Sequence, residues 1–148
     1  MTLIDFYVLD KNSTQEQHHF ACRLIEKAVR QGNRVMVATK DAAETKALDE
    51  ALWSFRPESF VPHVALSESD ESNEYAELSP VVISHTEDDP SHHDVLVNLR
   101  LSVPEQFSRF QRLAEIVIQE ETVLQNSRRN FAFFKERGYP VNTHKLKV

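Results

Sequence analysis

Short apolar runs alternate along this chain with longer segments in which apolar residues recur at helical spacing. The first run, LIDFYVL at 3–9, has the aliphatic and aromatic content of a central strand. Ser13 and Glu16 stand at capping-box spacing, which predicts a helix from there to about Gln31. Gly32 then ends the helix, because glycine readily adopts the left-handed conformation found after a helix C-terminus. The chain therefore opens with a strand followed by a helix.

The same order repeats in the next segment. The run NRVMVAT at 33–39 comes directly after the helix-ending glycine and predicts a second strand. Asp41 is well placed to cap a second helix, AAETKALDEALW at 42–53. Two successive strand–helix units predict parallel strands joined by right-handed crossovers.

The second half of the chain is more varied. Residues 64–77 are rich in carboxylates and poor in apolar side chains, so they predict a solvated loop. Further strands are expected at 80–85, 95–101 and 113–119, a short helical turn at 104–110, a last helix at about 121–137 before Gly138, and an edge strand at 139–146. We therefore expect one α/β domain over residues 1–148, with a mostly parallel central sheet flanked by helices.

Composition limits the classes of function. A chain of 148 residues with 41% hydrophobic content suits one buried core, and its apolar runs fall far short of the roughly 20 residues of a membrane span. The first residues lack the features of a signal peptide, so we expect a cytoplasmic protein with no membrane contact. The single cysteine, Cys22, lies in an apolar helical pattern and is expected to be an inert packed thiol. The net charge of -6 argues against electrostatic binding of nucleic acid by the protein surface as a whole.

The sequence shows none of the usual catalytic or cofactor motifs. With only two glycines it has neither a P-loop nor a dinucleotide fingerprint, which excludes nucleotide binding by the usual device. The pairs His18–His19 and His92–His93 have no partners at zinc-ligand spacing and are interpreted as surface histidines. No nucleophile elbow is present, and the carboxylates fall in loops or on outer helical faces. A small α/β hydrolase or transferase that uses loop carboxylates is the alternative function.

The C-terminal helix concentrates cations and aromatic rings in an otherwise acidic protein. In QNSRRNFAFFKERG, Arg128, Phe131 and Lys135 follow one another at spacings that place all three on one helical face. Such a surface suits an acidic peptide that ends in an apolar side chain, because arginine can bind a carboxylate while a ring packs beside it. The alternative, of equal weight, is an ordinary last turn in which cations stabilise the helix dipole and phenylalanines pack in the core.

Five segments of the chain are distinctive as an ordered set: FYVLD in the first expected strand, GNRVMVAT at the second, LDEALWSFRPESFVPH, DVLVNLR, and the ending RRNFAFFKERGYPVNTHK. Together they resemble the chi subunit family of the bacterial DNA polymerase III holoenzyme. The most specific is LDEALW followed by PESFVPH, and the similarity extends over nearly the whole chain. The acidic stretch from Ser67 to Glu77 matches least, as expected of a variable surface loop.

The resemblance implies an accessory role in DNA replication without catalysis. Chi proteins look like degenerate, Rossmann-like nucleotide-binding folds without a phosphate loop, which agrees with the scarcity of glycine. The family binds the psi subunit, which tethers it to the clamp loader, and the acidic C-terminal tail of single-stranded-DNA-binding protein. The resemblance therefore implies a bridge that needs no cofactor and contacts DNA only indirectly.

The tail-binding surface of the family carries over to Val117, Gln125, Arg128 and Phe131 in this sequence. Arg128 is expected to meet the carboxylate of the tail, and Phe131 is expected to form a wall of the pocket.

This sequence departs from the family pattern at two positions of that surface. Leu124 and Ala132 stand where basic residues occur in well-known members. Fewer cations are expected to lower the affinity and its salt dependence, unless Arg129 or Lys135 substitutes for them.

The psi-binding surface carries over to the segment after the second helix, at Trp53, Phe60, Val61 and Pro62. Large apolar side chains at such a place predict an exposed apolar surface of the kind that marks a partner site. Simple structural packing of these side chains is the alternative.

Overall fold

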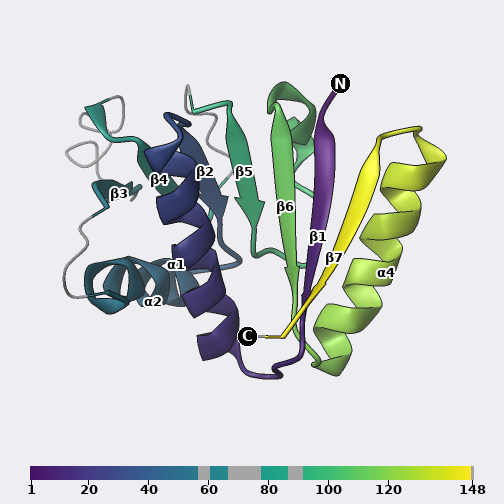
Figure 1. The fold of residues 1–148 in the computed structure, drawn as a ribbon, viewed down its shortest axis with the longest axis horizontal. Coiled ribbons are helices and arrows are strands. Elements are labelled where there is room, and N and C mark those ends of the chain that lie inside the picture. Colours follow the sequence, from purple (N-terminus) through teal and green to yellow (C-terminus); the bar gives the residue numbers. More distant parts are fainter. Residues whose placement is uncertain (57–60, 67–77, 87–91, 148) are drawn as a thin grey trace.

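One parallel β-sheet forms the centre of the molecule (Figure 1). The computed structural model describes residues 1–56, 61–66, 78–86 and 92–147, and within these ranges the sheet has seven strands in the order β3-β4-β2-β5-β6-β1-β7. Each neighbouring pair of these strands is parallel. The strands are β1 (Leu3–Leu9), β2 (Val35–Ala38), β3 (His63–Ala65), β4 (Val81–Ser84), β5 (Val95–Asn98), β6 (Arg112–Val117) and β7 (Val141–Leu146). The helices are α1 (Thr14–Arg30), α2 (Ala42–Ser54), the 3-10 helix η2 (Glu105–Arg109) and α4 (Glu121–Glu136).

Successive side chains of a strand point to opposite faces of a sheet, and this alternation divides the core into two layers. Leu9 of β1 and Ile116 of β6 belong to one buried cluster, together with side chains of α1 and α2. Ile4 of β1 and Leu113 of β6 belong to the other cluster, where they pack with Phe134 of α4. Helices α1 and α2 therefore cover one face of the sheet, and α4 covers the other.

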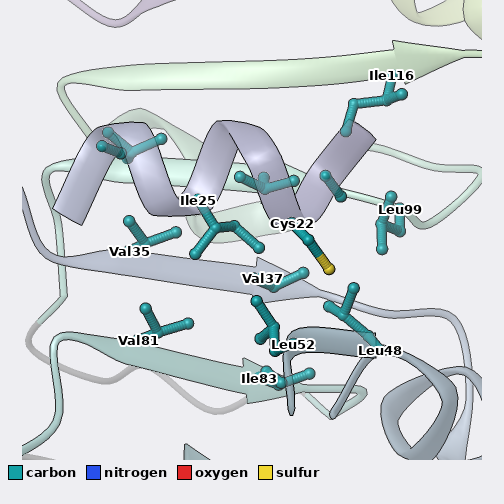
Figure 2. Packing of buried hydrophobic residues seen from close by; sticks show 14 of the residues in the cluster. Cys22, Ile25, Val35, Val37, Leu48, Leu52, Val81, Ile83, Leu99 and Ile116 are labelled. Atoms are coloured by element: carbon teal, nitrogen blue, oxygen red, sulfur yellow. The ribbon is translucent and has the colours of Figure 1, made fainter. Parts of the chain in front are cut away.

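The layer under α1 and α2 is built from aliphatic side chains and the one cysteine (Figure 2). Cys22 and Ile25 of α1 lie over Val37 of β2, and Leu52 of α2 closes the same cluster. All four side chains are fully buried. Burying an aliphatic side chain of this size contributes roughly 1.5 to 3 kcal/mol, so this cluster is a main source of stability.

The predicted helix ends are confirmed. Ser13 and Asp41 each accept the main-chain amide of the third residue that follows, at 3.2 and 2.8 Å. Gly32 and Gly138 have φ angles of 85° and 78°, the left-handed conformation in which glycine ends a helix. No helix in the described ranges is long and apolar enough to cross a membrane.

The predicted α/β fold with a parallel sheet is confirmed, and one element is corrected. Strand β3 overlaps the start of the range 64–77, which the sequence predicted to be a loop. This strand has three residues and, among the strands that the structure describes, pairs only with β4, so it is too short to show a periodic pattern. Residues 67–77 of that range lie outside the described residues.

The N-terminal strand is an interior strand of the sheet. In Figure 1, β1 lies between β6 and β7, and Ile4 has Leu113 on one side and Val141 on the other. Strand β7 is the edge strand beside it, as its proline-containing sequence predicts. Strands β1 and β7 are therefore neighbours, and because they run parallel, the ends marked N and C lie at opposite edges of the sheet (Figure 1).

Candidate functional site

In a parallel α/β sheet, ligands usually bind outside the carboxyl ends of two neighbouring strands whose following helices lie on opposite faces. Strands β1 and β6 are such a pair, because α1 follows β1 and α4 follows β6. Here Gln119 donates from Nε2 to the Leu9 carbonyl at 2.9 Å and from its main-chain amide to the Lys11 carbonyl at 2.8 Å. Gln17 donates from Nε2 to the Ile116 carbonyl at 2.9 Å. The protein's own amide groups therefore bridge this crevice.

The space beside the bridged crevice is small. Its volume is about 20 Å³, and its lining includes Gln17, Asn98, Glu115 and Asn130. That is room for about one water molecule, whereas ligand pockets typically exceed roughly 300 Å³. Asn98 donates from Nδ2 to Glu115 Oε1 at 2.9 Å. Burial raises the pKa of Glu115 from 4.5 to about 8, although the hydrogen bond from Asn98 acts in the opposite direction.

Arg100 lies across the carboxyl ends of the neighbouring strands β2 and β4. Its guanidinium group donates to three main-chain carbonyl oxygens, those of Thr39 at 2.9 Å, Ser84 at 3.2 Å and Thr86 at 2.7 Å. Thr39 directly follows β2, and Ser84 is the last residue of β4. The positive charge at this edge of the sheet is therefore used to hold strand ends together.

The histidine pairs are only partly on the surface. His18 is buried, with Nε2 at 3.0 Å from Glu44 Oε2, and His92 is buried against the main-chain carbonyl of Ser79. The prediction of surface histidines is therefore wrong for His18 and His92, which are both buried. Each has a polar partner, and this makes its burial acceptable. In the described ranges, no group of three or more histidine, cysteine or acidic residues could hold a metal ion.

The α4 cationic surface consists of Arg128, Phe131 and Lys135, all exposed on α4. Phe131 is 36% exposed, and its ring packs edge-on against Phe6 with 5.5 Å between centroids. The Lys135 ammonium lies 5.7 Å from the centroid of the Phe131 ring. The Phe131 ring is therefore held on its buried side by Phe6 of the core, and Lys135 lies near it at the surface.

The other expected tail-binding residues differ in their exposure. Val117 is 4% exposed and packs in the core cluster that the half-buried Leu124 also contacts. Gln125 is exposed and donates from Nε2 to Glu121 Oε1 at 2.9 Å. Val117 therefore supports α4 from beneath, while Gln125 lies on its outer surface.

Arg129 faces a different side of α4 from Arg128. Successive residues of a helix are rotated by about 100°, and Arg129 is turned towards η2. It lines a mostly apolar groove of about 450 Å³, the α4–η2 groove, together with Val103, Pro104, Glu105, Phe107, Asn130 and Phe133. The structure therefore separates Arg129 from the α4 cationic surface.

The expected psi-binding residues are also divided by the structure. Trp53 is 59% exposed and packs edge-on against His63 with 5.3 Å between centroids. Pro62 is exposed. Val61 is 3% exposed and belongs to the core, which corrects its expected place on an exposed surface. Phe60 lies outside the described residues.

Sequence reasoning missed the residues that close the carboxyl edge of the sheet. Arg100 and Gln119 act on main-chain carbonyls, and no sequence spacing reveals such partners. A weaker signal was available for Asn98 and Glu115, which interrupt apolar strands with polar side chains. A polar residue in a buried strand requires a hydrogen-bond partner and therefore marks a place to look for one.

Comparisons with known proteins identify relatives along almost the full chain. The family model described as "DNA polymerase III chi subunit, HolC" matches residues 1–142. DNA polymerase III subunit chi of Pseudomonas aeruginosa is 40% identical over 146 residues, which cover 99% of this chain and 98% of that protein. The subunit chi of Escherichia coli is 29% identical over 143 residues, which cover 93% of this chain and 94% of that protein.

Solved structures of low sequence identity share the fold. T4 UvsW matches with a TM-score of 0.70 at 8% identity, over 99% of this chain and 42% of that chain. Mss116p DEAD-box helicase domain 2, bound to an RNA duplex in that structure, matches with a TM-score of 0.67 at 11% identity, over 97% of this chain and 64% of that chain. At such identities the likeness concerns the arrangement of strands and helices alone.

Proposed function

This chain belongs to the DNA polymerase III chi subunit family, and we propose that it is a non-catalytic bridge in the replication machinery. In this proposal, the psi subunit binds at the Trp53 side of the molecule and attaches the chain to the clamp loader. The acidic C-terminal tail of single-stranded-DNA-binding protein binds at the α4 cationic surface. The clamp loader is thereby held at protein-coated DNA in the cytoplasm, and the chain contacts DNA only indirectly.

The α4 cationic surface is the observation that carries the proposal. Phe131 offers an exposed ring whose base is fixed against Phe6, so a peptide side chain can pack on it at little cost in conformational entropy. Arg128 precedes this ring by one helical turn, and Lys135 follows it by another. A peptide that ends in an apolar residue and a carboxylate finds a partner for each group within these turns.

The carboxyl edge of the sheet supports a role without catalysis. The crevice between β1 and β6 is bridged by Gln119 and Gln17, and Arg100 is engaged with strand carbonyls. A substrate of ordinary size would have to displace several internal hydrogen bonds to enter there. We therefore assign function to the outer surfaces of the molecule.

We place the psi contact at the end of α2. Trp53 is the most exposed aromatic side chain among the described residues, and exposed tryptophans frequently dominate interface energetics. Pro62 is exposed in the same region, and the buried Val61 fixes the segment to the core. Phe60, the remaining residue of this proposed surface, follows from the family pattern alone.

Calorimetric titration with a synthetic peptide of the partner's acidic C-terminus tests the proposal. We expect Arg128→Ala to weaken binding by roughly 1.5 to 3 kcal/mol, the range for a hydrogen bond to a charged group. Arg129→Ala is the matched control, since it removes the same side chain from the neighbouring position on the other side of α4. This control is expected to keep the affinity within about 0.5 kcal/mol of wild type.

Equal losses in the two variants would indicate attraction by overall charge and would count against a defined site. Unchanged affinity of Arg128→Ala would refute the assignment of the tail surface. Free single-stranded DNA serves as a second ligand, because direct DNA binding predicts that DNA binds at least as tightly as the peptide.

A further inference from the structure

The α4–η2 groove is a second exposed surface, on a side of α4 that the proposed bridging function leaves unused. We propose that this groove docks an acidic segment of a partner protein, which inserts one bulky apolar side chain between α4 and η2. This inference is independent of the contacts proposed for psi and for the tail. It follows from the volume, the lining and the charges of the groove.

The walls of the groove are apolar and well supported. Phe133 of α4 and Phe107 of η2 pack edge-on with 5.8 Å between centroids, and Phe107 packs in turn on Phe134 at 5.4 Å. Val103 and Pro104 complete the apolar lining on the η2 side. A groove of about 450 Å³ with such walls has room for an aromatic or large aliphatic side chain. Because the rings are held by the core, the groove is formed before a partner arrives.

The charges on the α4 side of the groove are positive. Arg129 lines the groove directly. The guanidinium carbon of Arg137 lies 3.8 Å from the centroid of the Phe133 ring, so this second cation stacks on the groove wall. Cations beside an apolar hollow complement an apolar side chain with neighbouring carboxylates. A basic segment would be repelled by both arginines.

Glu105 makes the two sides of the groove differ in charge. It lines the side opposite the arginines, in the first turn of η2. Acidic groups of the partner therefore lie beside Arg129 and away from Glu105. Removing the Glu105 charge is expected to strengthen binding, while removing a cation on α4 weakens it.

The test uses the full chain and the blocked peptide acetyl-Asp-Asp-Phe-Asp-Asp-amide. Its blocked end removes the terminal carboxylate that the tail surface is proposed to recognise. Amide chemical-shift mapping on isotope-labelled protein is expected to show changes at Val103, Phe107, Arg129 and Phe133. We expect Arg129→Glu to weaken binding of this peptide by about tenfold or more, and Glu105→Gln to strengthen it by about twofold.

Arg128→Glu is the matched control, with the same charge change one position away on the other side of α4. It is expected to keep the affinity for the blocked peptide within about twofold of wild type while it weakens the tail peptide. The reverse pattern is expected for Arg129→Glu, so the two proposals fail separately. Both arginines are exposed, so neither change should prevent folding.

Four results would overturn the docking proposal. They are the absence of shifts at millimolar peptide, shifts centred on Phe131, equal binding of a peptide with asparagine in place of aspartate, and a dimer of the chain that buries Phe133.

Discussion

Asn98 and Glu115 lie side by side on adjacent strands, and the amide nitrogen of Asn98 donates to Glu115 Oε1 at 2.9 Å. Glu115 is 5% exposed, in a sheet whose other central residues are almost all apolar. Burial raises its pKa from 4.5 to about 8, so the carboxyl group carries its proton at neutral pH. The core therefore contains the side chain of Glu115 in its neutral form.

Glu115→Gln should change how stability depends on pH. Between pH 4.5 and about 8 the native protein retains a proton that the unfolded chain has already released. Stability therefore falls as pH rises through this window and levels off above it. Glutamine keeps the acceptor for Asn98 and cannot ionise. The variant should match wild type near pH 4.5 and exceed its stability by an amount on the order of a few kcal/mol above pH 8.

Urea unfolding of both proteins at several pH values measures this difference. Glu136→Gln is the control, because Glu136 is exposed on α4. The control should follow the wild-type curve throughout. A constant difference between Glu115→Gln and wild type across the window would show that Glu115 does not titrate as inferred.

The Cys22 thiol should be nearly unreactive in the native protein. Burial raises its pKa to about 12, and the thiolate is the reactive form. We expect an aromatic disulfide reagent at pH 8 to label the native chain at least about a hundredfold more slowly than the urea-unfolded chain. Because Cys22 is the only cysteine, Cys22→Ala supplies a blank for the assay. Labelling at similar rates in both states would contradict the packed position of the thiol.

Arg100→Ala should destabilise the fold. The side chain holds three carbonyl oxygens at the ends of β2 and β4, and its removal leaves them without this charged donor. A loss of roughly 2 to 4 kcal/mol is expected in denaturant unfolding. Arg100→Lys should recover part of it, since a single ammonium group cannot reach all three oxygens. The exposed Arg128→Ala serves as control, with an expected change within about 0.5 kcal/mol.

Trp53 should report on psi binding by its own fluorescence. It is the only tryptophan of the chain and is 59% exposed, so burial under psi should shift its emission to shorter wavelength. Trp53→Ala should weaken psi binding by about 2 kcal/mol or more with little effect on folding. Leu101→Ala is a control, because Leu101 is also exposed but follows β5 at the carboxyl edge of the sheet. Equal losses of affinity for psi in Trp53→Ala and Leu101→Ala would contradict a specific contact of psi with Trp53.

Most of the fold could be predicted because its signals are local. The caps at Ser13 and Asp41 and the glycines after α1 and α4 each depend on a few adjacent residues. Strand β3 could not be predicted, because three residues at an edge show no period and depend on β4 for their conformation. Whether such a short strand forms depends on its pairing with a segment that is distant in the sequence.

The candidate site could be predicted only in part. Helical spacing was enough to bring Phe131 and Lys135 together on α4. Spacing could not show that Arg129 enters a groove with η2, because that contact joins segments separated by β6. It also could not separate the buried Val61 from the exposed Pro62, since both lie in one apolar stretch. Whether a side chain is exposed depends on how the sheet and the helices pack together in the folded protein.

The position of β1 between β6 and β7 sets the order in which the chain can fold. During synthesis the first strand leaves the ribosome long before either neighbour, since Ile4 pairs with Leu113 and Val141. Contacts over such sequence separations form slowly. A chain that stops before β7 leaves β1 as an open, apolar edge of the kind that pairs with other chains and aggregates. Strand β7 is thus the one that protects β1.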